Sequence, residues 1–386
     1  MKTLSVLGST GSIGTATLDV VRHFPDRFRV VALAAGRNLE LLAAQVREFR
    51  PQLVAVADSE KARELSQRFP DLAVLAGNEG RIAAATHPEA TTVVAAFVGA
   101  LGLPAVHAAV RAGKELLLAN KETLVVAGEL VTAEARRSGS RIIPVDSEHN
   151  GLFQALQVGP PGTARRLILT ASGGPFRTTP LEDLARVKPE DALAHPTWRM
   201  GAKISVDSAT MMNKGLEIIE AHHLFGFPPD AIDVVVHPES RVHALVEYVD
   251  GTLMAQLSIN DMRFAILYAL AYPERLPTPF GRLDLVALGA LHFEAPDERR
   301  FPCLALARHA LAASGTAPAA LNAANEVAVE LFLAGRLPFL GIAELVGRVL
   351  EEELGRVAPV ACLEDALAAD ARARARAREI ARHLAS

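Results

Sequence analysis

The sequence predicts an α/β protein with three parts: an N-terminal doubly wound parallel sheet, a central α+β domain and a C-terminal helical bundle. Short apolar runs alternate with helical patterns over residues 1–146. A second series of strand-like runs follows over residues 147–276, and residues 302–386 are alanine-rich and helical in pattern. Strands that alternate with helices pair in parallel, so the first part is predicted to be a doubly wound sheet.

The first part contains a series of candidate strands, most of them followed by a helical pattern. They are Leu4–Leu7, Phe28–Ala34, Leu53–Ala57, Ala73–Leu75, Thr92–Phe97, Glu115–Leu118 and Arg141–Val145. The stretch from Val93 to Val110 is almost uncharged and could suggest a membrane span. Gly99, Gly102 and Pro104 divide it, so we predict a buried strand and a helix instead.

The central part has candidate strands at Leu167–Thr170, Ile232–Val236, Val242–Val249 and Leu253–Ile259. Asp250 and Gly251 form a hairpin signal between the last two strands. Residues 187–200 are rich in proline and histidine, contain the single tryptophan and lack periodicity. We therefore predict a mobile lid here, with residues 194–201 as its flap.

The prolines of residues 277–301 predict a linker that crosses the surface. The C-terminal part follows with predicted helices at 303–314, 318–334, 340–353 and 363–384, joined by short loops as in a small bundle. Alanine and arginine alternate over residues 370–378. Both are strong helix formers, so a solvated terminal helix is a better interpretation than a nucleic-acid-binding arm.

Composition favours chemistry on small molecules. The chain has 386 residues, 50% of them hydrophobic and 22% charged, and a net charge of −4. That charge gives no general attraction to nucleic acid or to an anionic membrane, and we expect neither partner. Cys303 and Cys362 are too few and too far apart for a disulfide framework or a thiolate metal site, which fits a reducing cytoplasmic setting.

Glycines at positions 8, 11 and 14 lie between a predicted strand and a predicted helix. Glycines there let the backbone approach a pyrophosphate, whose charge the helix N-terminus stabilises, so the loop predicts dinucleotide binding. A glycine-rich turn for another phosphate is the alternative. After the second strand comes Gly36-Arg37-Asn38, and an arginine there suits the 2′-phosphate of NADP unless it is merely an exposed residue at a helix start.

Two carboxylates, Asp146 and Glu148, stand two residues apart. If Ile142 to Glu148 runs extended, both point to one face and supply half of a divalent-metal site. The alternative is a strand end followed by a helix, with Ser147 or Asp146 as its cap and Glu148 in its first turn.

Residues 205–220 combine hydroxyls, an amide and a lysine with a carboxylate one helical turn from the amide. Ser208, Asn213 and Lys214 could hold a phosphate while Glu217 reaches a metal beside it; an amphipathic helix with solvated side chains is the alternative. The turn Ser172-Gly173-Gly174 could be an anion nest or a plain loop. His195 and His243 would contact substrate oxygens only if they lie near that anion site.

Together these motifs resemble the 1-deoxy-D-xylulose 5-phosphate reductoisomerase family. The resemblance covers nearly the whole chain through GSTGSIG, GRN, LANKE (Leu118–Glu122), PVDSEHN, SGGPF, HPTWRMG, SVDSATMMNKGLE and HPES-VH. It implies a Rossmann-like cofactor domain and a homodimer. It also implies NADPH- and divalent-metal-dependent (Mg²⁺, Mn²⁺ or Co²⁺) rearrangement and reduction of 1-deoxy-D-xylulose 5-phosphate to 2-C-methyl-D-erythritol 4-phosphate, in the non-mevalonate synthesis of isoprenoid precursors.

The resemblance also implies a role for each residue that matches a motif of the family. NADPH contacts are implied at Thr10, Gly11, Ser12, Ile13, Gly36, Arg37, Asn38, Asn120, Glu122 and Gly201. Metal ligands are implied at Asp146, Glu148 and Glu217, and substrate contacts at Lys121, Ser147, Glu148, Ser172, His195, Ser208, Asn213, Lys214 and Glu217. The candidate catalytic residues are Lys121, Glu148, His195 and His243.

The chain departs from the family pattern at two positions. Arg37 stands where the family commonly has lysine, which preserves the charge, and Asn260 stands where it usually has proline, which concerns the local backbone. On the residues alone two rival functions stay open. An NADP-dependent dehydrogenase without rearrangement would not need three metal-binding carboxylates, and a nucleotide-sensing regulator would need neither those carboxylates nor the lid.

Overall fold

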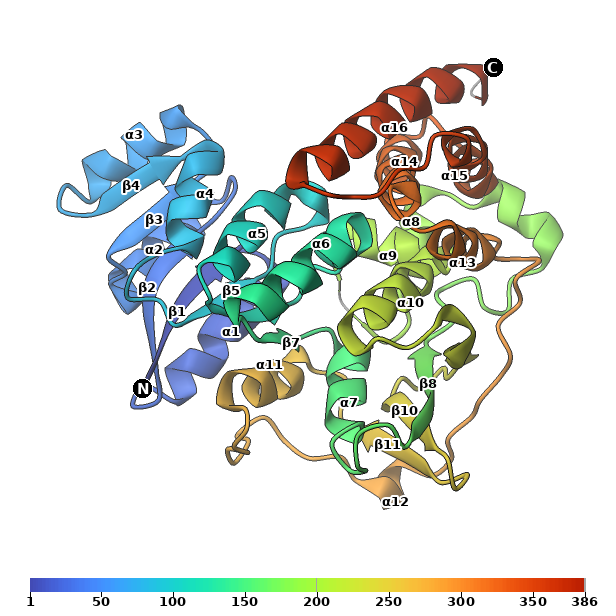
Figure 1. Cartoon of the computed structure of the whole chain (residues 1–386), viewed down its shortest axis with the longest axis horizontal. Coiled ribbons are helices and arrows are strands. Elements are labelled where there is room, and N and C mark those ends of the chain that lie inside the picture. Colours follow the sequence, from blue (N-terminus) through green and yellow to red (C-terminus); the bar gives the residue numbers. More distant parts are fainter. Residues whose placement is uncertain (199, 385–386) are drawn as a thin grey trace. The chain divides into compact units, whose positions relative to one another are not determined.

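The computed structural model describes residues 1–198 and 200–384, and over these the chain forms two compact units (Figure 1). The first comprises Met1–Thr123, Val131–Asn150 and Asp261–Gly281, and the second comprises Leu124–Leu130, Gly151–Asn260 and Arg282–Ser386. Arg199, inside the predicted flap, lies outside the described residues. The units group the segment after Asn260 with the first sheet and the C-terminal helices with the second, so the domain boundaries at 146 and 276 stay predictions.

In the described part of the first unit, a seven-stranded parallel sheet has the order β4-β3-β2-β1-β5-β6-β7. Its strands are β1 (Lys2–Leu7), β2 (Phe28–Ala34), β3 (Leu53–Val56), β4 (Ala73–Ala76), β5 (Thr92–Ala95), β6 (Glu115–Leu118) and β7 (Ile142–Pro144). Each predicted strand is present with ends shifted by at most two residues. The doubly wound parallel sheet is therefore confirmed.

Helices connect these strands. They are α1 (Ser12–His23), α2 (Leu39–Phe49), α3 (Ser59–Arg68), α4 (Gly77–Ala85), the 3₁₀ turn η1 (Gly99–Gly102), α5 (Leu103–Arg111) and α6 (Glu122–Ser138). A further helix of this unit, α11 (Met262–Ala271), comes later in the chain and contacts α1. The uncharged stretch from Val93 is divided into β5, η1 and α5, as predicted. Within residues 1–198 and 200–384, no helix combines the length and the apolar character needed to cross a bilayer.

The central strands of this sheet are buried on both faces, which explains their continuous apolar runs. Leu4, Val6 and Leu7 of β1 are fully buried. Because all seven strands are parallel, the loops that follow β1, β2, β6 and β7 share one edge of the sheet. β1 lies between β2 and β5, so the chain reverses its direction of strand addition at β1, and ligands bind at such a switch point.

In the described part of the second unit, a four-stranded sheet has the order β11-β10-β8-β9. Its strands are β8 (Ala164–Ala171), β9 (Ile232–Val236), β10 (Val242–Tyr248) and β11 (Leu253–Leu257). β8 and β9 are parallel and the other pairs are antiparallel. The predicted hairpin turn is present, with Gly251 at φ +81° and the Tyr248 amide donating to Thr252 O at 2.9 Å. Asn260 donates from its side chain to Glu239 O (3.4 Å), a contact that proline could not make.

The remaining helices lie in the second unit, except that α7 begins in the first. They are α7 (Ser147–Ala155), η2 (Leu181–Arg186), α8 (Pro189–Leu193), α9 (Ala202–Ala209), α10 (Met212–Phe225), η3 (Pro229–Ala231), α12 (Leu285–Leu288), α13 (Cys303–Ala313), α14 (Ala317–Leu333), α15 (Phe339–Leu354) and α16 (Leu363–Leu384). Between Arg282 and Phe301 the chain is largely exposed and irregular apart from α12 and a bridge from Glu294 to Val236, as a linker predicts.

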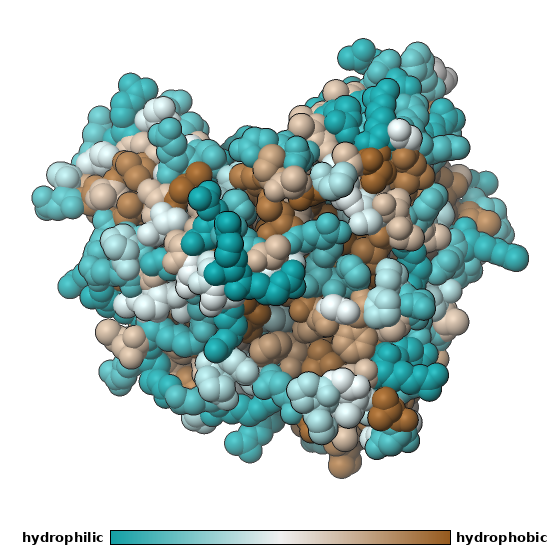
Figure 2. Space-filling view, viewed as in Figure 1, coloured by the Kyte–Doolittle hydropathy of each residue, from teal (hydrophilic) through white to brown (hydrophobic). Residues whose placement is uncertain are grey.

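The predicted helical bundle is present, and α14 is its central helix, in contact with α13, α15, α16 and α9 (Figure 1). The alternation of alanine and arginine forms part of α16. Ala373 and Ala377 are fully buried, whereas Arg372 pairs with Glu353 (2.8 Å) and Arg374 pairs with Asp370 (2.7 Å). The arginines are thus held in intramolecular ion pairs while the alanine stripe packs inward. On the face drawn in Figure 2, hydrophilic side chains surround smaller apolar areas.

Candidate active site

The loop between β1 and α1 can be built only with glycine at its two ends. Gly8 has φ +88°, and a Cβ on it would lie 2.4 Å from Ala96 O. A Cβ on Gly14 would lie 2.2 Å from Gly8 O. No side chain caps the first turn of α1 at Gly11, so backbone N–H groups at the helix start are available to an anion. The predicted cofactor residues Thr10, Gly11, Ser12 and Ile13 all lie in this loop and turn.

Gly36, Arg37 and Asn38 connect β2 to α2 at the same edge of the sheet. Asn38 caps α2 by accepting from the Leu41 amide at 3.1 Å. Arg37 lines an open pocket, and Lys61 of α3 lines the same pocket. Glutamates 40 and 64 line this pocket too, and both pair with Arg68. Two cationic side chains therefore border the pocket at the end of β2.

The segment after β6 carries a buried amide network. Asn120 donates to Gly99 O (3.0 Å) and to Glu122 Oε2 (2.8 Å), and it accepts from the Thr123 hydroxyl (2.6 Å). These partners fix which end of the Asn120 amide is the donor. Both predicted cofactor residues here, Asn120 and Glu122, thus lie at the same edge of the sheet as the glycine loop.

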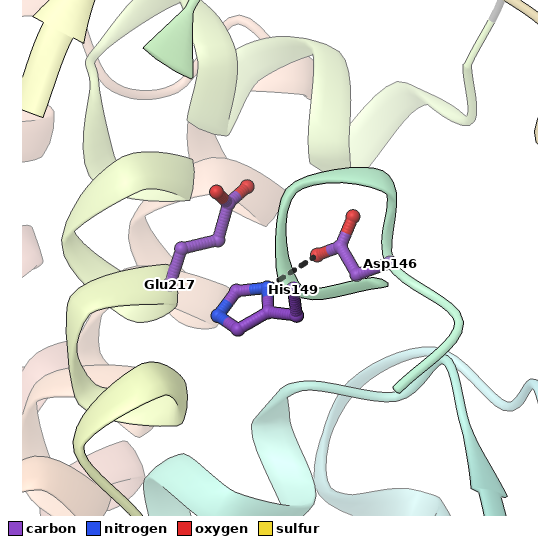
Figure 3. A group of neighbouring side chains, drawn as sticks. All are labelled: Asp146, His149 and Glu217. Atoms are coloured by element: carbon purple, nitrogen blue, oxygen red, sulfur yellow. Dashed lines mark ion pairs between the residues drawn. The ribbon is translucent and has the colours of Figure 1, made fainter. Parts of the chain in front are cut away.

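Lys121 and Asp146 form a buried ion pair in the first unit. Lys121 Nζ lies 2.6 Å from Asp146 Oδ2, and the two side chains are 7% and 15% exposed. The fully buried ring of His149 faces the same oxygen, with Nδ1 at 3.8 Å (Figure 3). Our reading of the sequence assigned no role to His149. Its position three residues after Asp146, at the start of a helix, could have indicated that the two side chains lie on the same face.

The expected extended conformation of Ile142 to Glu148 is wrong. β7 ends at Pro144 and α7 begins at Ser147, so Glu148 lies in the first turn of a helix. The Ser147 amide donates to Asp146 Oδ1 (3.0 Å), and the Ser147 hydroxyl donates to Glu148. The structure therefore matches the alternative, a strand end followed by a helix. Alternation along a strand cannot be the reason that Asp146 and Glu148 would share a ligand.

In the second unit, α10 places Asn213, Lys214 and Glu217 together. Glu217 is fully buried and accepts from Asn213 Nδ2 (2.5 Å) and from Lys214 Nζ. Lys214 is only 3% exposed. The contact between Asn213 and Glu217 confirms their predicted shared face, and the burial excludes the alternative in which these side chains are merely solvated. Figure 3 shows the Glu217 carboxylate projecting from α10.

A second polar cluster in this unit joins Ser172, His195 and Ser208. His195 Nε2 lies 3.0 Å from Ser172 Oγ and 3.1 Å from Ser208 Oγ. The backbone N–H groups of Thr197 and Trp198 donate to His195 Nδ1, at 3.3 and 3.0 Å. Nδ1 is therefore the acceptor, and Nε2 carries the proton of a neutral ring. Burial lowers the pKa of His195 below its ordinary value of 6.5, which favours the same neutral form.

Glycine also lets the turn after β8 approach α9. Gly173 and Gly174 have φ of +82° and +68°, and a Cβ on Gly174 would lie 2.6 Å from Ser208 O. The Gly174 amide donates to Ser172 Oγ at 3.1 Å. The Ser-Gly-Gly segment is thus a packed turn whose Gly174 N–H is bonded within the turn, and the anion nest stays a prediction.

The remaining predicted residues also fall in the second unit. His243 is buried in β10, and its Nε2 lies 2.9 Å from Ser258 Oγ. The Trp198 ring is centred 6.2 Å from the His243 ring. Gly201 precedes α9 as its N-cap residue. His243 is therefore linked to the predicted flap through an aromatic contact.

Comparison with known proteins identifies the relatives of this chain. The family model described as 1-deoxy-D-xylulose 5-phosphate reductoisomerase matches residues 4–128, and the model of the C-terminal domain of that enzyme matches residues 142–225. The model described as the DXP reductoisomerase C-terminal domain matches residues 257–376.

Similar proteins and solved structures bear the same name. The 1-deoxy-D-xylulose 5-phosphate reductoisomerase of Moorella thermoacetica is 56% identical, with 99% of each chain covered. That of Symbiobacterium thermophilum is 54% identical, with 98% of each covered. A solved DOX-P reductoisomerase in complex with NADPH, fosmidomycin and magnesium has a TM-score of 0.95 at 42% identity, covering 99% of this chain and 98% of that one. The Zymomonas mobilis enzyme in complex with NADPH has a TM-score of 0.91 at 43% identity, with 98% of each chain covered. The chain therefore belongs to the 1-deoxy-D-xylulose 5-phosphate reductoisomerase family.

Proposed function

We propose that this chain converts 1-deoxy-D-xylulose 5-phosphate to 2-C-methyl-D-erythritol 4-phosphate with NADPH and a divalent cation, through the residues described above. The observation that carries the assignment of residues is a pair of carboxylates, the largely buried Asp146 and the fully buried Glu217, each paired with a lysine. Burying an ionised carboxylate is costly, so such groups are retained where a charge is needed. The solved relatives in complex with magnesium and NADPH support the choice of the metal ion and the cofactor.

The donor set fits a hard divalent ion. Asp146, Glu148 and Glu217 offer carboxylate oxygens, which Mg²⁺ and Mn²⁺ prefer. Bound there, the ion would act as a Lewis acid on neighbouring substrate oxygens. Lys121 holds positive charge beside Asp146, where it can stabilise negative charge that develops on the substrate. We assign Lys121 and Glu148 to catalysis for this reason, with Ser147 as a substrate contact beside them.

NADPH supplies the hydride for the reduction. We propose that the Gly8–Gly14 loop holds its pyrophosphate at the start of α1, because no side chain caps the helix there. Asn120 and Glu122, fixed by the network after β6, would contact the same cofactor, and Gly201 is assigned to it as well. Arg37 would meet the 2′-phosphate.

Arg37→Asp should weaken NADPH binding by about 1–3 kcal/mol, because a charge-assisted contact is lost and a like charge faces the phosphate. NADH affinity should change little, since NADH lacks the 2′-phosphate. The measurement is the KM of each cofactor in both proteins. Equal constants for NADPH and NADH in the parent protein would contradict the assignment, and an effect of Lys61→Ala without an effect of Arg37→Asp would transfer it to Lys61, which lines the same pocket.

The substrate phosphate is assigned to the second unit. The hydroxyls of Ser172 and Ser208 and the ring of His195 lie together. Asn213 and Lys214 add an amide and a buried charge. The neutral His195 ring would donate from Nε2 to a phosphate oxygen. The segment from residue 194 to residue 201 carries His195 and Trp198, so we propose that it closes as a flap and excludes water. His243, in contact with Trp198, would support the closed flap.

His195→Gln should keep most of the substrate affinity, because the glutamine amide can donate from near the position of Nε2. His195→Asn places its amide near Nδ1 instead and should raise the KM for the phosphorylated substrate about tenfold, the cost of one good hydrogen bond to a charged group. Because the lowered pKa keeps the parent ring neutral at pH 7 and above, the ratio of KM values between parent and His195→Gln should stay constant from pH 7 to pH 8. A ratio that changes over this range would show that the ring titrates there.

One assay separates this function from its rivals. NADPH oxidation should require both the divalent cation and 1-deoxy-D-xylulose 5-phosphate, and the product should carry the rearranged carbon skeleton. A dehydrogenase without rearrangement would reduce its substrate with the skeleton unchanged. A nucleotide-sensing regulator would bind NADPH without oxidising it.

We also propose that the chain forms a homodimer in the cytoplasm. β11 is an edge strand of the second sheet, and Leu253 at its start is 51% exposed. Val249, before the hairpin turn, is 67% exposed. An exposed edge strand with apolar side chains is a common site of pairing with a second copy. Sedimentation of the purified chain would test this, and a monomer at micromolar concentration would contradict it.

A further inference from the structure

A buried carboxylate lies directly behind the proposed phosphate site. Asp207, on α9, is 1% exposed. Its Oδ2 lies 2.7 Å from Lys203 Nζ, and its Oδ1 accepts from Asn325 Nδ2 at 2.8 Å. Lys203 belongs to the same short helix, whereas Asn325 comes from α14, 118 residues further along the chain.

The stability of α9 itself does not explain this arrangement. Asp207 lies near the C-terminus of the helix and Lys203 near its N-terminus, which is the unfavourable orientation of both charges in the helix dipole. A lysine four residues before an acidic residue is also the weaker order for a helical ion pair. The contact with Asn325 of α14 therefore explains much of why a carboxylate is buried here.

Asn325 is suited to hold α9 in place. It is fully buried in α14, the central helix of the bundle. Asn322 is equally buried on the same helix, but its amide donates within that helix to Glu326 (3.0 Å). Of these two asparagines, Asn325 is the one whose amide reaches Asp207.

Ser208 follows Asp207, and its hydroxyl belongs to the cluster with His195 and Ser172. The Ser208 carbonyl packs against the Gly174 turn. Successive residues of a helix point about 100° apart, so Asp207 can face α14 while Ser208 faces the cluster. A rotation of α9 by about 20° would move a side-chain oxygen by more than about 1 Å, enough to damage a binding site.

We propose that Asn325 is a positioning residue for the phosphate site: through Asp207 it fixes the rotation of α9 and hence the position of the Ser208 hydroxyl. The C-terminal bundle then takes part in substrate binding without touching substrate. This inference rests on the proposed assignment of Ser208 to the substrate phosphate.

The test compares Asn325→Ala with Asn322→Ala, a matched change on the same buried helix. Asn325→Ala should raise the KM for 1-deoxy-D-xylulose 5-phosphate and the inhibition constant of fosmidomycin about tenfold, with the KM for NADPH within twofold of the parent. Asn322→Ala should leave all three within twofold. The exchange Asp207→Asn with Asn325→Asp should return the substrate KM to within about threefold of the parent, because Asn at 207 can donate to Asp at 325 and still accept from Lys203. Asn325→Asp alone should be worse than Asn325→Ala, because it would place a second carboxylate against that of Asp207.

Thermal unfolding of each variant separates positioning from stability. If Asn325→Ala lowers the melting temperature and leaves the substrate KM unchanged, or if both asparagine variants change KM alike, the proposal is overturned. If Asn325→Ala does not fold, Asn325→Leu takes its place; it has a similar volume but cannot donate to Asp207, and an unchanged KM would overturn the proposal equally. Ser208→Ala is measured beside them: an unchanged KM there would overturn the phosphate site itself, whereas a raised KM with no effect at Asn325 would overturn only this inference.

Discussion

Replacing Glu217 with glutamine should reduce metal-dependent turnover by about 10²-fold or more, because a buried charged ligand for the divalent ion is lost while the shape of the side chain is kept. Asp146→Asn should have the same effect from the first unit. NADPH binding should survive in both variants, since neither carboxylate is among the residues proposed to hold NADPH. Chelation of the metal in the parent protein should reproduce the loss, and added Mg²⁺ or Mn²⁺ should reverse it.

The matched control is Glu220→Gln. Glu220 lies on the same helix as Glu217, and both side chains are fully buried. The two variants make the same substitution at buried positions three residues apart on one helix, so a general effect of burying an amide would appear in both. Calorimetric titration of Mg²⁺ and fluorescence titration of NADPH measure the two affinities separately. Unchanged metal affinity in Glu217→Gln and Asp146→Asn would show that these carboxylates serve only as partners of Lys214 and Lys121.

The parallel sheet was predictable because its signal is local. A strand buried on both faces must be apolar throughout, so runs such as Phe28–Ala34 identify themselves, and the glycines between β1 and α1 mark the turn that follows. The C-terminal helices were predictable for the same reason: each has its own periodicity, and the short loops between them contain glycine or proline. Pairings within one turn of a helix, such as Asn213 with Glu217, were also accessible.

The start of α7 was not resolved by the sequence, because Pro144 to Glu148 satisfies two local patterns at once. The β-branched residues Ile142, Ile143 and Val145 favour a continuing strand, and the Asp-Ser-Glu sequence favours a helix start. The structure takes the helix, so the geometric argument for a shared ligand at Asp146 and Glu148 was wrong although both residues remain candidates. Local propensity cannot rank two such patterns when tertiary packing decides between them.

Contacts between distant segments were beyond the sequence. Lys121 meets Asp146 across two strand ends, and Asn325 meets Asp207 across 118 residues. Nothing in the residues around an asparagine in an alanine-rich helix indicates that its amide will satisfy a carboxylate elsewhere. A long-range pair of this kind depends on how the helices pack. No local pattern in a single sequence indicates that packing.

Gly14→Ala should lower the free energy of unfolding by about 3 kcal/mol and weaken NADPH binding by about 10²-fold, because the added methyl group meets backbone that cannot move aside. Its Cβ would lie 2.2 Å from Gly8 O and 2.5 Å from Ser9 Cα, so either the loop or the first turn of α1 must shift. The same shift would displace the N–H groups that are proposed to receive the pyrophosphate.

Gly36→Ala is the control for the stability part of this prediction. Gly36 lies at the same edge of the sheet, and a Cβ there would meet nothing within 4 Å, so its free energy of unfolding should change by less than about 1 kcal/mol. Denaturant unfolding measures both variants, and fluorescence titration measures NADPH binding by Gly14→Ala. Because the clash acts through the loop, the metal affinity of Gly14→Ala should equal that of the parent once the protein is folded. A variant at Gly14 that is as stable as the parent and binds NADPH normally would mean that the loop relaxes without cost. The close approach of α1 to the loop at Gly8 and Ser9 would then have no part in holding the cofactor.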